Sequence, residues 1–499
     1  MNQQSTWHWD RRDICCLLLI TTIGGIFRLW SVTSPGGFIL DEFYAADACL
    51  YVGGSPSVCH TDHELTSVHP PLGKWLIGTG ILLVGFGPAG WRIASVAAGT
   101  LTICALYFMA RKLFNSTLGA AIASGLLAFD FLHFVFSRTA MLDIFVTFFI
   151  VIAFMFAVLD RARLFAPQSE IRRPAYDLRW RILAGTAAGA ACACKWSGLP
   201  ALASLLLLTG SWEWKKARTI RGQRPIETIR RIAPSLFLCF VLIPASVYML
   251  SYTGRLGGTI FAWPWAENSW LRALVERQIM MLGFHTDLSG SHPYTSPAWS
   301  WLLLKRPVLM YFKESGQGAY REILGFGSPL VWWASIAALL WATFSQIKDR
   351  RFDTPVGVIL IGFIACYGPW LLIGQSRQQV FLYYLLPAVP FMCLALAAVA
   401  VKLANSSVGS LATGVFAAGS IGLFGYYYPL LVARPLPYSS WEARMLFRNC
   451  DGSVNLVGGA QRRFAFYGHD GEFDQQRSQE HTLRPQTTLG APPQGWCWP

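Results

Sequence analysis

The stretch "GWRIASVAAGTLTICALYFMARKLF", residues 90–114, is an apolar run that ends on the basic pair Arg111-Lys112. A bilayer core requires about 20 apolar residues per helix, and this run has that length. Basic residues concentrate on the cytoplasmic side of membrane proteins, so the pair predicts that the helix ends inside. Similar runs recur along most of the chain, which indicates a polytopic membrane protein made of helices.

The composition supports this class. Of the 499 residues, 54% are hydrophobic and only 14% are charged, whereas soluble domains carry about 25% charged residues. The net charge of +14 would suggest nucleic acid as the partner of a soluble protein. Here the positive-inside rule explains much of the excess, so we expect acidic membrane lipids as partners and no nucleic acid. The first apolar run has no small-residue cleavage site and is predicted to be a retained helix.

Apolar runs and basic clusters together predict about eleven membrane spans. Pro200 marks a break between the fifth and the sixth. The expected spans lie near 13–33, 88–110, 116–136, 141–159, 182–198, 199–213, 234–252, 328–346, 356–374, 379–401 and 409–432.

The basic clusters also predict the orientation. With the N-terminus in the cytoplasm, almost every basic cluster faces inside. Two long loops, 34–87 and 253–327, then face outward. We expect residues 1–433 to form one transmembrane catalytic domain and 434–499 to form a non-cytoplasmic tail.

Both outer loops are rich in aromatic residues, His and Pro. The apolar run within "HPPLGKWLIGTGILLVGFG" (69–87) is short for a span, and 261–285 has an amphipathic pattern. Both segments are predicted to be helices that lie along the membrane surface. A platform of this kind would suit a substrate with a lipid tail and a polar head.

The pair Asp41-Glu42 follows the first apolar run, among aromatic residues at the expected outer boundary. One interpretation is a helix cap or a solvated loop. The functional interpretation is a general base. A carboxylate that is partly removed from water has a raised pKa, which suits it to accept a proton.

Several cations fall on the expected outer side, against the usual bias. Charges at membrane depth normally have partners or a function. One interpretation is ion pairing, for instance of Arg138 with Asp143, and the other is a cluster that receives a lipid-linked phosphate or orients the acceptor. The candidate substrate-binding residues are His69, Lys74, Arg92, Arg138, Lys195 and Arg377.

One carboxylate beside a basic cluster is the minimum that glycosyl transfer from a polyprenyl-phosphate sugar requires. A phosphate leaving group needs positive charge or hydrogen-bond donors where negative charge develops. A hydroxyl acceptor is a poor nucleophile and needs a base.

Several segments of the chain resemble those of a known family. The segments that carry the resemblance are "LDEFYAADACLYV", "HPPLGKWLI", "LAFDFLHFVFSRTAMLDIFVTFF", "CKWSGL" and "HPYTSPAWSWLLLKRPVLMYF", in this order. From about residue 24 to 449 the chain is similar to the protein O-mannosyltransferase family. The bacterial branch of that family comprises the polyprenyl-phosphate-mannose–protein mannosyltransferases.

The resemblance implies a GT-C fold of about eleven helices. It also implies an inverting transfer of mannose from polyprenyl-phosphate-mannose to Ser or Thr of secreted or membrane proteins, outside a bacterial plasma membrane. Asp41 would be the base, and Glu42 would position the acceptor or orient Asp41. Arg92 would face the donor phosphate, and Arg138 with Asp143 would be structural or donor-binding.

The chain departs from the eukaryotic members of this family, and its motifs also allow other functions. Eukaryotic members carry a MIR domain in the second outer loop, and 253–327 is too short to hold one, which leaves acceptor selection open. The main rival is a GT-C transferase that moves another polyprenyl-phosphate-linked sugar onto a lipid or glycan. A transporter would have internal repeats around a midplane site, and a scaffold would have no use for an acidic pair beside outer cations.

The 12 cysteines show no metal-binding spacing. Two pairs, Cys49 with Cys59 and Cys450 with Cys497, would be able to form disulfides in an oxidising compartment. A divalent metal is compatible with these residues but is not implied, since only one clear carboxylate pair is present.

Overall fold

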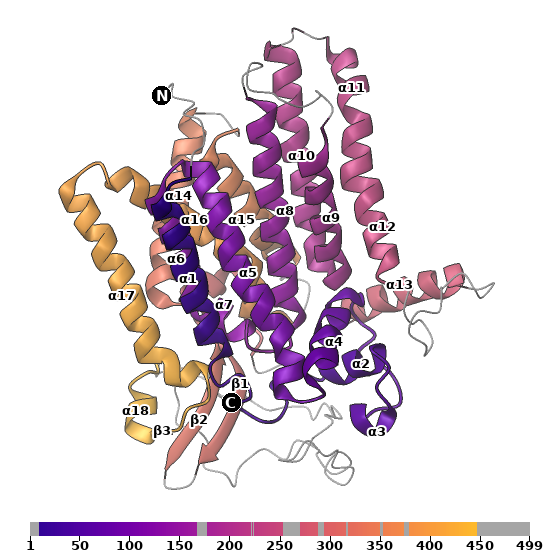
Figure 1. The fold of residues 1–499 in the computed structure, drawn as a ribbon, viewed down its shortest axis with the longest axis vertical. Coiled ribbons are helices and arrows are strands. Elements are labelled where there is room, and N and C mark those ends of the chain that lie inside the picture. Colours follow the sequence, from indigo (N-terminus) through magenta and orange to yellow (C-terminus); the bar gives the residue numbers. More distant parts are fainter. Residues whose placement is uncertain are drawn as a thin grey trace.

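The computed structural model describes residues 9–166, 177–220, 222, 224–252, 270–287, 294–315, 318–349, 353–373 and 379–446. The described chain is a bundle of long helices, with short helices and a small sheet gathered at one end (Figure 1).

Every one of the eleven expected spans falls on helix. The helices are α1 (Arg11–Leu29), α5 (Pro88–Phe114), α6 (Thr117–Ala128), α7 (Phe131–Phe136), α8 (Leu142–Leu164), α9 (Arg179–Cys194), α10 (Leu199–Lys215), α11 (Pro225–Phe237) continued through η4 (Leu238–Leu242) into α12 (Ile243–Leu250), α14 (Pro329–Asp349), α15 (Pro355–Ile373), η7 (Leu382–Ala388) continued into α16 (Val389–Leu403), and α17 (Ser407–Leu431).

The protein is a multi-pass membrane protein. By length and composition, seven described helical segments can cross a bilayer: α5, α8, α11–α12, α14, α15, η7–α16 and α17. The count of eleven spans stays a prediction. The break expected between 182 and 213 is confirmed: α9 ends at Cys194, a 3₁₀ turn covers Trp196–Gly198, and α10 begins at Leu199. Pro200 lies in the first turn of α10, where its missing N–H breaks no helical bond.

Small residues allow α9 to approach its neighbour closely. A Cβ on Gly185 would overlap the carbonyl of Cys239, and a Cβ on Gly189 would lie 2.6 Å from the Cα of Pro244. The α11–η4–α12 segment therefore packs directly on the α9 backbone. This contact fixes the direction of α9, which ends next to Lys195.

The segments expected in the outer loops lie together at the same end of the bundle (Figure 1). They are α2 (Tyr44–Tyr51), α3 (Pro56–Cys59), α4 (Leu72–Val84) and α13 (Trp270–Asp287). Helix α13 exposes Leu271, Val275, Ile279 and Leu282, whose spacing places them along one side of the helix. This pattern agrees with the amphipathic surface helix expected over 261–285, of which 261–269 lies outside the described residues.

A small antiparallel sheet, which the sequence analysis did not anticipate, adds to the helices at this end. Its strands are β1 (Val308–Ser315), β2 (Ala319–Gly325) and β3 (Leu436–Pro437), in the order β1-β2-β3. Gly318, at φ +72°, precedes β2 in the turn, a conformation that glycine adopts without strain.

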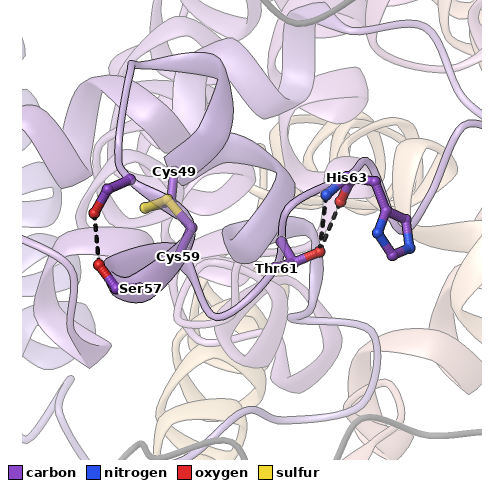
Figure 2. Close-up of a disulfide and its surroundings, with 6 residues drawn as sticks. Cys49, Ser57, Cys59, Thr61 and His63 are labelled. Carbon is purple, nitrogen blue, oxygen red and sulfur yellow. Dashed lines mark hydrogen bonds between the residues drawn. A yellow bond between two sulfur atoms is a disulfide. The ribbon is translucent and has the colours of Figure 1, made fainter.

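Cys49 of α2 and Cys59 of α3 form a disulfide, which joins two short helices of the segment 34–87 (Figure 2). The first of the two expected pairings is therefore confirmed. Cys450 and Cys497 lie outside the described residues. A Cβ on Gly54 would overlap both sulfur atoms, so the tight loop between the two helices requires glycine there.

Candidate active site

The acidic pair lies in the turn that connects α1 to α2. Glu42 is fully buried, whereas Asp41 is half-buried. The Glu42 carboxylate accepts hydrogen bonds from the backbone N–H of Ile39 and of Ala140, both at 2.9 Å. Glu42 therefore fastens the turn to the start of α8, and its neighbour Asp41 remains partly accessible.

Arg92 of α5 is the charge partner of Glu42. Its Nε and Nη2 atoms donate to the two carboxylate oxygens at 2.8 and 2.7 Å, in a bidentate arrangement that is strong and directional. The remaining guanidinium bonds reach carbonyl oxygens at 2.8–2.9 Å, those of Val32, Pro35 and Gly37.

All five N–H groups of the Arg92 guanidinium are therefore engaged by the protein itself. The side chain is completely buried. This geometry does not support the expected contact of Arg92 with the donor phosphate. It assigns Arg92 to holding the acidic turn.

Arg138 has a similar structural setting. Its guanidinium lies at the C-terminal end of α1, where a cation stabilises the unpaired carbonyls of the helix end. The ion pair expected between Arg138 and Asp143 is wrong, because Asp143 pairs with Lys195. Arg138 donates to the carbonyl oxygens of Phe27, Arg28, Trp30 and Ser31 at 2.6–3.0 Å.

Lys74 of α4 is buried in an ion cluster between α1 and α5 along the chain, in the segment 34–87. Its Nζ lies 2.9 Å from Asp47 Oδ2 and 2.6 Å from Glu64 Oε1, and it also donates to the Thr66 carbonyl. Glu64 binds Arg277 of α13 as well. Burial alone would raise the pKa of Glu64, but the charges of Lys74 and Arg277 outweigh it and lower that pKa. Lys74 therefore connects α2, α4 and α13, and the expected phosphate contact gains no support.

Lys195 lies between the end of α9 and the following 3₁₀ turn, in extended backbone. Its Nζ contacts the two carboxylate oxygens of Asp143 at 3.0 and 3.2 Å. The same Nζ lies 4.8 Å from the centre of the Tyr384 ring and 6.0 Å from that of Tyr383. The break in the helix thus places a cation at the end of the bundle that carries α2, α4 and α13, where aromatic faces and one carboxylate stabilise it.

Tyr44 lies near both Asp41 and Asp143, the carboxylate that pairs with Lys195. Asp41 and Asp143 lie within electrostatic range of both Tyr44 and Tyr383. Burial, followed by the charges of Asp41 and Asp143, raises the pKa of Tyr44 well above its ordinary value, so the hydroxyl keeps its proton. Asp41, the Lys195–Asp143 pair and the tyrosines therefore share one site.

A series of aromatic rings links this site to α13. The ring of His69 lies 6.2 Å from that of Tyr44 and stacks on His285 of α13 at 5.3 Å. The His285 ring lies 6.0 Å from that of Trp196, the residue after Lys195. His69, a predicted site residue, thus lies beside the cluster.

Hydrogen bonds provide a second link to α13. Trp196 Nε1 donates to the Tyr248 hydroxyl at 2.9 Å, and that hydroxyl donates to Gln278 Oε1 at 2.6 Å. The sequence did not predict His285, Trp196 or Tyr44 as site residues. The only available signals were the position of Trp196 in "CKWSGL" and of Tyr44 in "LDEFY".

Arg377 and a metal site remain to be considered. Arg377 lies in 374–378, beyond the described residues. Among the residues that the structure does describe, no group of three or more His, Cys, Asp or Glu side chains is placed to hold a metal ion. The described side chains therefore offer a half-buried carboxylate, a lysine and tyrosine hydroxyls for chemistry.

Comparison with known proteins identifies the family that the sequence motifs resemble. Residues 88–254 match the family "Dolichyl-phosphate-mannose-protein mannosyltransferase", and 270–450 match the "C-terminal four TMM region of protein-O-mannosyltransferase". The polyprenol-phosphate-mannose–protein mannosyltransferase of Corynebacterium glutamicum is 30% identical over 502 residues, covering 88% of this chain and 94% of the relative. The protein of the same name from Mycolicibacterium smegmatis is 28% identical over 475 residues, covering 86% and 91%.

The fold has a solved counterpart. The Saccharomyces cerevisiae protein O-mannosyltransferase Pmt1-Pmt2 complex bound to the sugar donor contains a chain similar to this one with a TM-score of 0.72 at 14% identity. The match covers 90% of this chain and 94% of that one. At this identity the likeness concerns the fold alone, and that fold is the expected GT-C architecture. Together with the sequence matches, it establishes that the chain belongs to the protein O-mannosyltransferase family.

Proposed function

We propose that the protein transfers mannose, with inversion, from polyprenyl-phosphate-mannose to Ser or Thr hydroxyls of secreted or membrane proteins. The names of the bacterial relatives support this activity. The observation that carries the proposal is the shared site of Asp41 and the Lys195–Asp143 pair. A base for an alcohol and a cation for a phosphate lie together at one end of the bundle.

The proposed reaction is a single displacement. Asp41 accepts the proton of the acceptor hydroxyl, and the hydroxyl oxygen forms a bond to the anomeric carbon of mannose. The bond between that carbon and the phosphate oxygen breaks, and the electron pair leaves with the polyprenyl phosphate. Attack from the face opposite the leaving group inverts the anomeric configuration.

Lys195 is the proposed partner of the departing phosphate. Arg92 and Arg138 are committed to protein carbonyls and to Glu42, whereas Lys195 shares the tyrosine cluster with Asp41. A lysine carries three N–H donors and a point charge suited to phosphate. We assign Glu42 to orienting Asp41, and His69 to orienting the acceptor. Arg377 remains a predicted donor ligand.

We further propose that the site faces outward across the plasma membrane. The disulfide between Cys49 and Cys59 supports this orientation, because disulfides persist in oxidising compartments outside the cytoplasm. The positive-inside bias of the basic clusters points the same way.

A transfer assay tests the activity and the orientation together. Purified protein should mannosylate a Ser/Thr peptide from polyprenyl-phosphate-mannose, and should use other polyprenyl-phosphate sugars poorly. A peptide that cannot cross membranes should be modified by right-side-out vesicles and not by inverted ones. Preference for another sugar, or for a lipid or glycan acceptor, would favour the rival GT-C activity.

Lys195→Gln should lower kcat/KM for the donor by about 10²-fold, the typical effect of removing one donor that stabilises developing negative charge. Glutamine can still donate a hydrogen bond to Asp143, so the local fold should persist. The measurement is initial rate against donor concentration at saturating acceptor peptide.

The matched control for this variant is Lys305→Gln. Lys305 is an exposed lysine at the outer end whose Nζ lies 4.8 Å from the Trp299 ring centre. The control should keep the donor kinetics of the unmodified protein. If Lys195→Gln changed only the KM for the peptide, Lys195 would not be the residue that binds the donor phosphate.

A further inference from the structure

A cavity lies far from the candidate active site. It has a volume of about 820 Å³ and opens between α6, α14, α16 and α17, which is within the size range of small-molecule pockets. The lining residues that come from α16 and α17 lie in the C-terminal half of α16 and the N-terminal half of α17. The chain enters α16 through η7, where Tyr384 meets Lys195. The α16–α17 turn therefore lies at the opposite end of the bundle from the site.

Most of the polar residues of this cavity lie at one end of the helices that line it. Lys402, Asn405 and Ser406 line it at the α16–α17 turn, whereas Leu396 and Phe416 line its deeper part. Ser406 to Phe416 is ten residues, which is about 15 Å of helix at 1.5 Å per residue. This depth is half of a hydrocarbon core of about 30 Å. The cavity is therefore about as deep as one leaflet, and its mouth at the α16–α17 turn is polar.

The mouth of the cavity is positively charged. Lys402 is exposed, and its Nζ lies 5.3 Å from the centre of the Trp341 ring, which also lines the cavity. Lys348 is exposed on α14 seven residues after Trp341, which is two helical turns along the same face. None of the described residues that line the cavity is acidic. The chemistry of the mouth therefore complements a negatively charged group.

We propose that this cavity binds an anionic phospholipid of the cytoplasmic leaflet. One acyl chain lies in the apolar part, and the headgroup phosphate lies at Lys402 and the polar turn. An exposed cation near the membrane surface attracts anionic lipid, and a Trp at the interface marks headgroup level. The sugar donor is not the expected occupant of this cavity, because its phosphate is proposed to bind Lys195 at the opposite end of the bundle.

Native mass spectrometry of the full chain in detergent tests the proposal, with dioleoylphosphatidylglycerol and dioleoylphosphatidylcholine as probes. The unmodified protein should bind the anionic lipid more tightly. Lys402→Gln should reduce this preference about fivefold, the effect of ~1 kcal/mol per cation. Ala412→Phe, which places a ring in the cavity, should reduce binding of both lipids.

Two variants serve as matched controls. Arg12→Gln removes an exposed cation that does not line the cavity, and Leu411→Phe enlarges an exposed residue next to Ala412 that does not line it. Both should bind lipid as the unmodified protein does. Equal preference in Lys402→Gln would overturn the proposal, as would unchanged lipid binding in Ala412→Phe. A dimer that Ala412→Phe disrupts would instead assign the cavity to a second copy of the chain.

Discussion

Asp41→Asn should yield a protein that folds in the membrane and loses mannose transfer by about 10²–10⁴-fold, the usual contribution of a general base. The amide matches the carboxylate in size but accepts no proton at neutral pH. Asp41 is half-buried, the Asn side chain has the same shape, and the Glu42 carboxylate, which bonds the N–H groups of Ile39 and Ala140, is left intact. The loss should therefore appear in kcat, with little change in the unfolding temperature. The measurement is transfer to a Ser/Thr peptide at saturating donor.

Asp62→Asn is the matched control for this experiment. Asp62 belongs to the same segment between α1 and α5, its side chain is 79% exposed, and it contacts His63. Its removal should leave both activity and stability unchanged, since such exposed pairs contribute little. Full activity of Asp41→Asn would remove Asp41 from the mechanism, whereas a large fall in unfolding temperature would show that Asp41 is structural.

The fold was largely predictable because its signals are local. A span needs about 20 apolar residues in sequence, so 88–110 and 141–159 are visible without knowledge of any partner, and both are helical in the structure. Pro200 was equally visible as a breaker. The sheet was not, because β1 lies next to an aromatic, apolar segment whose pattern does not separate a strand from an interfacial helix.

The roles of the cations were less predictable, because their partners are remote in sequence. An arginine on the outer side of a membrane protein is placed there either for a ligand or for the protein. The sequence does not distinguish these cases: Arg92 meets Glu42 across 50 residues, and Arg138 reaches Phe27 across 111. Lys195 pairs with Asp143, which lies 52 residues earlier in the sequence.

The tertiary structure also adds a helix to the site. His285 comes from α13, 216 positions after His69, and the two rings stack at 5.3 Å. An amphipathic pattern predicts that α13 lies on a surface, but it does not predict which loop the polar face meets. The pairing of Arg277 with Glu64 decides that contact, and both residues looked like ordinary loop and helix charges in the sequence.

Arg92→Ala should destabilise the protein by about 3–5 kcal/mol, because it leaves the buried Glu42 carboxylate without its partner. Three loop carbonyls also lose their donor. Activity should fall as well, since the turn that carries Asp41 is no longer held. The measurement is the unfolding temperature of the purified protein, with Arg272→Ala as control. Arg272 is 81% exposed on α13, and its loss should cost little.

A double-mutant cycle separates the structural role of Arg92 from a phosphate role. If Arg92 serves mainly Glu42, then Arg92→Met combined with Glu42→Leu should be less destabilised than the sum of the two single variants, by about 0.5–3 kcal/mol. The double variant contains no buried, uncompensated charge, and apolar replacements of a buried ion pair are often tolerated. A donor-binding arginine would behave differently, because its removal would raise the donor KM while leaving the unfolding temperature unchanged. If Arg92→Ala raised the donor KM and left the unfolding temperature unchanged, Arg92 would be a ligand of the donor phosphate. Its bidentate contact with Glu42 would then have to open when donor binds.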